Sequence, residues 1–311
     1  MDVFYKCIDA GSKYCPCELA HSLDCISCSH LSGKDYCDCN WNGVCILYEY
    51  YMNNMESKNP RNYYEGLVID KKSLGDNLYL LKIKTLGALI EEMNTVGAYV
   101  FINKTKDKSY YNVPMSISCM DKEHIYIVYD EIGPKTKGIF KGDRLSIKGP
   151  YFNGIIGVRK LSNIKNSNIL ILGRGLGQSS IILAIEKLRR ENKIYLFIDK
   201  GKTSSTYALD FIGKENIYIR EIDFFQNKGV EELGTFLKEK KIDVVFSAGS
   251  EMLQRKIKSI IDNLNLDIKW FVTNNNILCC GEGICGSCIR KSSTGNRIKT
   301  CKAIVDPMNF Y

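Results

Sequence analysis

The chain has 311 residues, 43 of them Lys or Arg and 35 Asp or Glu, giving a net charge of +8. This length suffices for two or three domains, and a composition of 45% hydrophobic and 25% charged residues is that of a soluble globular protein. Basic residues are spread along the chain without a dense block, which argues against nucleic-acid binding. No apolar run is long enough to cross a membrane and no signal peptide is evident, so we expect a cytoplasmic protein without membrane insertion.

The fourteen cysteines fall mainly into two groups, eight between residues 7 and 45 and five between 279 and 301. In a reducing cytoplasm such groups favour metal or cluster ligation over disulfides. The first group lies in a segment too short to bury a sufficient core, which predicts a Cys-rich module over residues 1–57 that a metal holds together. The candidate ligands are Cys15, Cys17, Cys25, Cys28, Cys37, Cys39 and Cys45. Zinc, an additional iron–sulfur cluster and a redox-labile thiol cluster all remain open.

Residues 58–160 contain short strand-like runs separated by turns. Examples are LYLLKIKT at 78–85, HIYIVYDEI at 124–132 and DRLSIKGP at 143–150. Short runs rich in β-branched and aromatic residues, broken by Gly and Asp, are typical of an antiparallel barrel or sandwich. We therefore predict an antiparallel β-barrel over this range.

Residues 161–275 alternate between buried strands and amphipathic helices. The predicted strands are NILILG at 168–173, KIYLFIDK at 193–200, DVVFSAG at 243–249 and DIKWFVT at 267–273. This alternation predicts an α/β domain with a parallel sheet covered by helices.

A glycine-rich turn, GRGLGQS at residues 173–179, follows the first of these strands and opens a helix. Gly173, Gly175 and Gly177 would let the backbone approach a pyrophosphate, whose charge a helix N-terminus favours. Such a turn is equally often a tight strand-to-helix connection. Asp199, at the end of the second strand, could accept a hydrogen bond from a ribose hydroxyl or lie in a solvated loop.

The C-terminal region, residues 276–311, contains CCGEGICGSC at 279–288. Cys280, Cys285 and Cys288 have the spacing C-x4-C-x2-C, and Cys301 follows after twelve intervening residues, which is the plant-type pattern for a 2Fe-2S cluster. The intervening glycines permit the sharp turns that such a loop needs. Tetrahedral zinc is the alternative, although zinc sites more often use paired C-x2-C motifs. Cys279 is surplus to four ligands.

A barrel, an α/β domain and this cysteine loop in that order resemble the electron-transfer subunit of type B dihydroorotate dehydrogenase, within the ferredoxin-NADP reductase superfamily. The small subunits of sulfide dehydrogenase-like and electron-bifurcating ferredoxin:NADP oxidoreductase enzymes are similar. The resemblance implies that NAD(P)H reduces FAD, that electrons pass singly through the 2Fe-2S cluster, and that they reach or leave a catalytic flavoprotein subunit. The resemblance does not account for the N-terminal module.

The family's flavin motif, Arg-Pro-x-Ser/Thr, is matched by Val113-Pro114-Met115-Ser116-Ile117. By this resemblance Pro114, Met115, Ser116 and Ile117 contact the flavin, and the Ser116 hydroxyl lies near its N5 atom. Gly133 and Thr136 match the residues that contact the FAD pyrophosphate, and Gly149 matches the turn that closes the flavin site. Lys135 and Lys137 could supply the positive charge that the family Arg provides.

The nicotinamide site is implied to include the glycine-rich turn and Gly249. The family's Cys-Gly-Pro element reads Ala248-Gly249-Ser250 here, so only the glycine is kept. With Val113 in place of Arg, this leaves a second hypothesis open, in which the chain is a non-enzymatic metal-binding or cluster-bearing adaptor on a decayed reductase frame. The first hypothesis is an NAD(P)H-dependent electron-transfer subunit.

Overall fold

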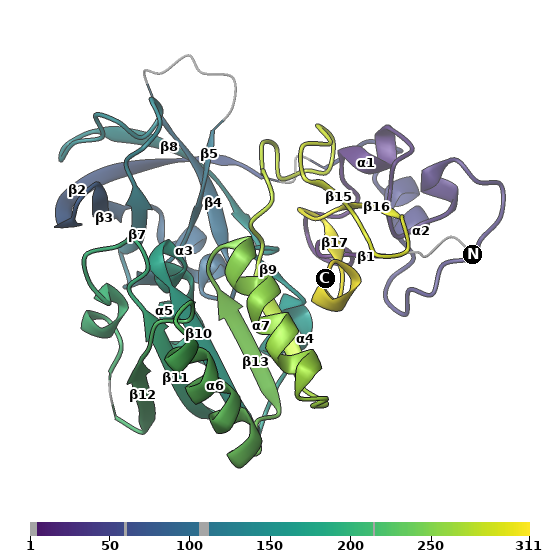
Figure 1. The fold of residues 1–311 in the computed structure, drawn as a ribbon. Coiled ribbons are helices and arrows are strands. Elements are labelled where there is room, and N and C mark those ends of the chain that lie inside the picture. Colours follow the sequence, from purple (N-terminus) through teal and green to yellow (C-terminus); the bar gives the residue numbers. More distant parts are fainter. Residues whose placement is uncertain (1–4, 59–60, 106–111, 214) are drawn as a thin grey trace.

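The computed structural model describes residues 5–58, 61–105, 112–213 and 215–311. These residues form two large β-sheets and a smaller lobe in which the N-terminal and C-terminal segments lie side by side (Figure 1). No helix among them is long and apolar enough to span a membrane.

The first sheet is antiparallel throughout and has the strand order β5-β4-β8-β2-β3-β7-β6. Its strands are β2 (Tyr63–Gly75), β3 (Leu78–Lys84), β4 (Tyr99–Lys104), β5 (Val113–Ser116), β6 (Cys119–Met120), β7 (His124–Asp130) and β8 (Arg144–Tyr151). The predicted antiparallel domain is confirmed, although within the described ranges the strand order is linear and the hydrogen bonds do not close a full barrel. Alternate side chains of the strands pack into one apolar core, which helix α3 (Gly87–Met93) covers with Leu89, Ile90 and Met93.

The second sheet contains the predicted strand-helix alternation. Its strand order is β12-β11-β10-β13-β14-β9, and all neighbours are parallel except β9. The strands are β9 (Ile155–Ile156), β10 (Asn168–Arg174), β11 (Lys193–Asp199), β12 (Ile217–Glu221), β13 (Val244–Ala248) and β14 (Lys269–Thr273). The short strand β9 falls inside the range predicted for the barrel, but it pairs with β14 and completes the α/β sheet.

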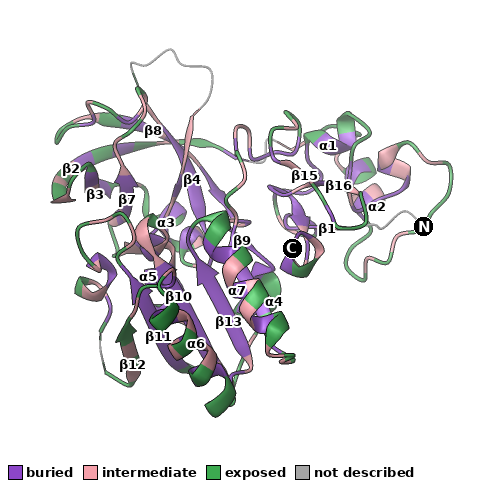
Figure 2. Ribbon diagram, in the orientation of Figure 1, coloured by how far each residue is buried: buried purple, intermediate pink, exposed green. Residues whose placement is uncertain are grey.

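Helices cover both faces of this sheet. Helices α4 (Val158–Ser162) and α5 (Gln178–Leu188) pack on one face, and α6 (Asn227–Glu239) and α7 (Glu251–Asn263) pack on the other. The central strands are buried along their length, while α6 and α7 turn exposed faces outward (Figure 2). A strand buried on both faces explains the uninterrupted apolar run ILIL at residues 169–172.

The smaller lobe joins the two ends of the chain. Strand β1 (Lys6–Cys7) pairs antiparallel with β17 (Ala303–Ile304), so Cys7 lies opposite Ala303 (Figure 1). The lobe also contains α1 (Glu18–His21), α2 (Ile46–Met52) and a hairpin of β15 (Ile289–Lys291) and β16 (Arg297–Lys299). Short 3-10 turns lie at His30–Ser32, Gly175–Gly177, Tyr207–Asp210 and Pro307–Asn309.

Candidate functional site

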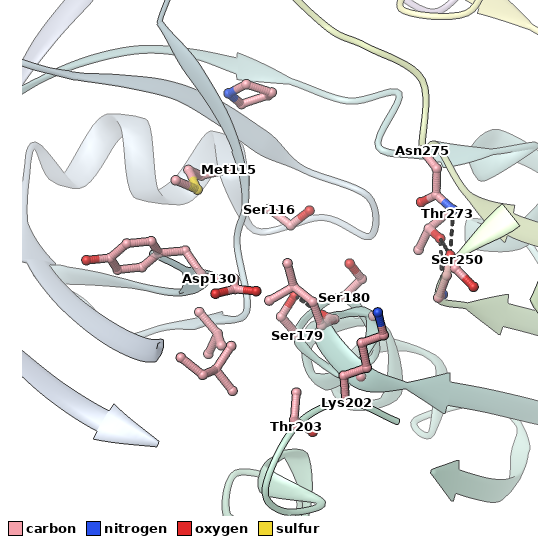
Figure 3. A pocket seen from close by; sticks show the side chains of 18 of the residues that line it. Met115, Ser116, Asp130, Ser179, Ser180, Lys202, Thr203, Ser250, Thr273 and Asn275 are labelled. Atoms are coloured by element: carbon pink, nitrogen blue, oxygen red, sulfur yellow. Dashed lines mark hydrogen bonds between the residues drawn. The ribbon is translucent and has the colours of Figure 1, made fainter. Parts of the chain in front are cut away.

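A cavity of about 1090 Å³ opens between the antiparallel sheet and the carboxyl ends of the parallel strands. Ligands of α/β proteins bind at this edge of the sheet, where backbone N–H groups and loop side chains converge. Eight residues predicted to bind a cofactor line it: Pro114, Met115, Ser116, Gly133, Thr136, Gly175, Gly177 and Gly249. Figure 3 shows Met115 and Ser116 facing Ser179, Lys202 and Ser250 across this cavity.

The segment that resembles a flavin motif forms the edge strand β5. Pro114 lies opposite Phe101 of β4, and Ser116 lies opposite Tyr99. Proline is tolerated there because an edge strand has one unpaired side. Ile117, which follows β5, does not line the cavity but is buried in the core of the antiparallel domain.

The loop after β7 forms a second wall of the cavity. Thr136 is buried, and its hydroxyl donates a hydrogen bond to the Gly133 carbonyl at 3.0 Å. The backbone N–H of Thr136 donates to the same carbonyl, so the two residues define one tight turn. Lys135 also lines the cavity. Positive charge is therefore present on this wall although Val113 carries none.

The glycine-rich turn lies at the N-terminus of α5, where the first-turn residues Ser179 and Ser180 also line the cavity. A Cβ atom at Gly177 would approach the Ala248 carbonyl oxygen to 2.4 Å, so this glycine allows two strand-to-helix loops to touch. Gly173 serves packing instead, because a Cβ there would meet Ile181 of α5 at 2.6 Å. Gly173 does not line the cavity.

Asp199 does not reach the cavity. Its buried carboxylate accepts hydrogen bonds from Arg174 Nε at 2.7 Å, from Gly201 N–H at 2.7 Å and from Phe224 N–H at 3.2 Å. These bonds hold Arg174, which does line the cavity, in place. Lys202 and Thr203, just beyond this strand, provide the cavity wall that Asp199 was expected to provide.

Gly249 lies at the end of β13 and is held by the end of β14. Its carbonyl accepts hydrogen bonds from the side chains of Asn275 and Thr273, and Ser250 caps helix α7 by accepting from Leu253 N–H at 3.3 Å. Thr273, Asn274 and Asn275 line the cavity. Sequence reasoning missed these three polar residues, although their position directly after a buried parallel strand was a usable signal.

Gly149 does not line the cavity; it lies in β8, next to the neighbouring strand β4. A Cβ atom there would meet Val100 at 2.9 Å, and the peptide bond to Pro150 is cis. Gly154, farther along the same segment, does line the cavity.

The C-terminal cysteines form two pairs. The sulfur atoms of Cys288 and Cys301 are 3.2 Å apart and buried. Their contact lowers the pKa of Cys288 to about 6 and raises that of Cys301, so the pair readily holds one thiolate. The Cys285 sulfur contacts the Ser287 hydroxyl at 3.0 Å; burial alone would raise the pKa of Cys285, but Ser287 and the nearby Cys280 outweigh it and lower that pKa. Among the described residues, no three His, Cys, Asp or Glu side chains are grouped to hold a single metal ion.

The loop between these cysteines has the backbone conformation that its glycines permit. Gly281, Gly283 and Gly286 have φ values of +69°, +78° and +74°, a region that other residues rarely adopt. The turn lets the Glu282 N–H donate to the Cys280 sulfur at 3.3 Å. Four thiols arranged as two pairs, with a backbone donor on one sulfur, fit a two-iron cluster better than a single ion.

A buried charge cluster, consisting of Asp9, Arg61, Glu282 and Lys302, anchors this loop. Lys302 Nζ donates to Asp9 at 2.5 Å and to Glu282 at 2.9 Å, while Arg61 donates to the same two carboxylates at 2.8 and 3.0 Å. Burial alone would raise the pKa of Asp9 and Glu282, but the charges of Lys302 and Arg61 outweigh it and lower both. The cluster is neutral overall and joins the N-terminal module, the segment just before β2 and the cysteine loop.

Comparison with known proteins defines the class of fold. No protein-family model matches the chain. An NADH-dependent reduced ferredoxin-NADP oxidoreductase superposes with a TM-score of 0.63 at 19% identity, covering 76% of this chain and 85% of that one. Ferredoxin-NADP+ reductase from Plasmodium falciparum gives 0.51 at 15% identity, covering 67% and 95%. The chain therefore has the ferredoxin-NADP reductase fold.

Sequence relatives are more specific. The chain is 23% identical over 248 residues to the electron transfer subunit of dihydroorotate dehydrogenase B (NAD(+)) from Clostridium perfringens, covering 77% of this chain and 94% of the relative. It is 25% identical over 238 residues to sulfhydrogenase 2 subunit gamma from Pyrococcus furiosus, covering 73% and 76%. The chain is a homologue of these two subunits, the first of which is named as an electron transfer subunit, and this confirms the resemblance seen in its motifs.

Proposed function

We propose that the chain is the electron-transfer subunit of a flavin and iron–sulfur oxidoreductase. It passes electrons between NAD(P)H, FAD and a 2Fe-2S cluster, and exchanges them with a catalytic flavoprotein subunit on another chain. The relatives support this proposal because they are named as subunits of a dihydroorotate dehydrogenase and a sulfhydrogenase. The substrate of the complete enzyme would bind and react on the partner chain.

One observation carries the proposal: a residue that lines the cavity is hydrogen-bonded to the segment that holds Cys301. Asn274 lines the cavity, and its side-chain amide donates hydrogen bonds to the carbonyls of Asn153 at 2.9 Å and Thr300 at 3.1 Å. Thr300 directly precedes Cys301, and Cys280 is six residues beyond Asn274. A cofactor bound in the cavity would therefore lie next to the cysteines, as single-electron transfer requires.

The residues of the cavity fit a flavin on one wall and a nicotinamide nucleotide on the other. Pro114, Met115 and Ser116 would contact the flavin ring, while the turn between Gly133 and Thr136 would hold its pyrophosphate. Lys135 lies on that turn and can offset phosphate charge. A bound flavin would supply the conversion of a two-electron hydride into single electrons.

The nicotinamide nucleotide would bind over the turn between Gly175 and Gly177. Backbone N–H groups at the start of α5 favour a pyrophosphate, and Arg174 and Lys202 add positive charge to this wall. Gly249 leaves space beside the flavin ring. Ala248 is fully buried in the sheet and brings no thiol to the cavity.

The 2Fe-2S cluster would take one pair of thiolates on each iron. Cys280 and Cys285 form one pair, and Cys288 and Cys301 form the other. Ile277 and Ile284 are 72% and 53% exposed on the same loop. Large exposed apolar side chains beside the cluster ligands suit the docking of a partner chain. Thiols of the N-terminal module would bind zinc or an additional iron–sulfur cluster.

The test is to purify the chain without oxygen and to measure flavin, iron and the visible spectrum before and after adding NADH. We expect about one FAD per chain and bleaching of both flavin and cluster absorption on reduction. Iron without flavin, even after reconstitution with FAD, would reject this function and leave the cluster-bearing adaptor.

A variant tests the nicotinamide wall separately. Gly177→Ala would push apart two loops, because its Cβ would lie 2.4 Å from the Ala248 carbonyl oxygen. We expect KM for NADH to rise by about tenfold or more with flavin content unchanged. Gly234→Ala on helix α6 is the matched control, since nothing lies within 4 Å of its Cβ position. Equal KM values for the two variants would show that the nicotinamide nucleotide does not bind at this turn.

A further inference from the structure

The N-terminal module is folded around its own thiols. A small closed cavity in this module is lined by four cysteines that are all buried, namely Cys7, Cys15, Cys17 and Cys25. None of them forms a disulfide. Apolar neighbours, including Leu19 and Ile46, complete the wall. Four buried thiols around one cavity are more than packing requires, because cysteine is a small hydrophobe that Ala or Val could replace.

Each of these four sulfur atoms also has a backbone N–H group directed at it. The donors are Asp9 for Cys7, Gly11 for Cys15, Leu19 for Cys17 and Ser27 for Cys25. Backbone N–H groups stabilise thiolates and are the hydrogen-bond donors that surround the sulfurs of iron–sulfur clusters. Burial still raises the pKa of all four thiols, so a bound metal centre would have to displace their protons, and the backbone N–H groups would then face the sulfurs that bind it.

We propose that Cys7, Cys15, Cys17 and Cys25 hold an iron–sulfur cluster, which is a second redox centre of the chain. Spacing alone had omitted Cys7 from the ligand set and had included Cys28, Cys37, Cys39 and Cys45, none of which lines this cavity. The tertiary structure brings Cys7 in, because pairing of β1 with β17 fixes its place.

The choice of cluster over zinc rests on how the sulfurs are distributed. Zinc requires all four sulfurs within about 2.3 Å of one ion. Within the described ranges, no three candidate ligands are grouped for a single ion. An iron–sulfur core attaches different thiolates to different irons, so the sulfurs surround it instead of converging on one point. Thiols lining the wall of a cavity match that second arrangement.

This second site lies directly against the C-terminal cysteine loop. Leu19, two residues after Cys17, is 3.0 Å from the position of a Cβ atom on Gly283. The buried charge cluster joins Asp9, two residues after Cys7, to Lys302, next to Cys301. Figure 1 shows the two segments side by side, on the side of the molecule away from β12.

Two adjacent clusters would suit the electron count of the reaction. A hydride from NADH carries two electrons, and NAD+ leaves once the flavin has taken them. A bound flavin would then release its proton to solvent and one electron to each cluster, and each electron would reduce one ferric iron to ferrous iron. This relay role rests on the proposed function, whereas the cluster site itself does not depend on flavin.

The experiment uses the full chain purified without oxygen, with iron, acid-labile sulfide, zinc and flavin measured together. Cys285→Ser removes a ligand of the C-terminal cluster, so the iron and the reduced-state EPR signal that remain would belong to the N-terminal site. We expect Cys17→Ser to lose that second signal and to accept one electron fewer per chain in a titration with dithionite. Cys119→Ser in the antiparallel domain is the matched control, and should keep both signals.

Several results would overturn the proposal. One is zinc, without extra iron, in the wild-type chain; another is an unchanged iron content in Cys17→Ser. If Cys17→Ser does not fold, the Cys285→Ser chain decides alone, because iron and sulfide must persist in it. Failure of the proposed function would look different: iron in both sites with no flavin, or with flavin that NADH does not reduce.

Discussion

The two cysteine regions of this molecule lie in contact, but different residues determine their structure. In the C-terminal loop, three glycines with positive φ shape the backbone, and Cys285 is exposed to solvent. In the N-terminal module, the cysteines are themselves the core, packed with Ala10, Ala20 and Leu31. A loop that glycines hold can keep its shape without metal. For a module whose core is thiols we expect stability to depend on a ligand, because so short a segment buries little surface.

The largest expected effect tests the C-terminal side of this comparison. Cys288→Ser removes one of two buried sulfurs that are 3.2 Å apart, and should abolish the 2Fe-2S signal. Cys279→Ser, one residue before the first ligand, should leave that signal intact, because Cys279 is surplus to four ligands. Iron analysis and EPR of the reduced chains are the measurements. Loss of the cluster in both variants would show that the ligand set has been assigned wrongly.

The next largest effect is expected from breaking the buried charge cluster, which connects the two cysteine regions. Lys302→Met would leave two buried carboxylates with Arg61 as their one strong partner in the buried charge cluster. Removing one member of a buried ion network costs about 3–5 kcal/mol. We expect the N-terminal module to become sensitive to limited proteolysis, while the FAD content stays unchanged.

Lys160→Met is the control for Lys302→Met. Its partner Asp306 is 3.2 Å away, but the lysine side chain is 66% exposed, so its loss should cost about 0–1 kcal/mol. Urea unfolding compares the two variants. Equal midpoints would mean that the buried charge cluster does not hold the module in place.

The sequence predicted the two large domains well and the contact between the two cysteine regions poorly. Alternating runs such as HIYIVYDEI and buried runs such as NILIL are local signals, and they became β7 and β10. Eight predicted cofactor residues line one cavity because motif positions at strand ends converge in this fold. The predicted flavin and nucleotide contacts themselves stay predictions.

What the sequence did not show depends on long-range contacts. Strands β1 and β17 have two residues each and no periodicity, yet they pair across almost the whole chain. Arg61 belongs to the polar stretch NNMESKNPRN at 53–62 but is buried between Tyr14 and Tyr151, with its guanidinium 4.4 and 4.2 Å from the two ring centres. Asp199 satisfies a strand-end pattern for ribose binding, but Arg174 occupies its carboxylate.

A smaller effect is expected from two glycine variants, whose comparison distinguishes the cost of backbone strain from the cost of lost packing in the cysteine loop. Gly281→Ala would place a Cβ atom 2.5 Å from the ring of Tyr151 at a φ of +69°. Gly295→Ala, in the β15–β16 hairpin, has a φ of +85° but meets nothing within 4 Å. The shared backbone strain costs about 1–3 kcal/mol, so the further loss in Gly281→Ala measures packing of the loop against β8. Thermal unfolding and cluster retention are the measurements. Identical behaviour would mean that the loop does not need this contact.

The smallest effect on stability is expected from changing Tyr99. This change gives the most direct information on a cluster bound by Cys288 and Cys301. Tyr99 is 2% exposed and packs with Cys288 and Cys301, yet its hydroxyl has no hydrogen-bond partner within the described parts of the chain. A buried hydroxyl without a partner costs about 1–3 kcal/mol. A cluster sulfur beside Cys301 would be an acceptor for it.

Tyr99→Phe should therefore leave the stability of the cluster-free chain unchanged or slightly higher, because no hydrogen bond is lost. In the cluster-loaded chain the same change should lower the reduction potential, since a donor to sulfur stabilises the more negative reduced state. Tyr151→Phe is the contrast: its hydroxyl donates to Glu282 at 2.9 Å, so it should destabilise both forms by about 1 kcal/mol. A spectroelectrochemical titration of both variants decides. An unchanged potential in Tyr99→Phe would mean that this hydroxyl does not bond to the cluster.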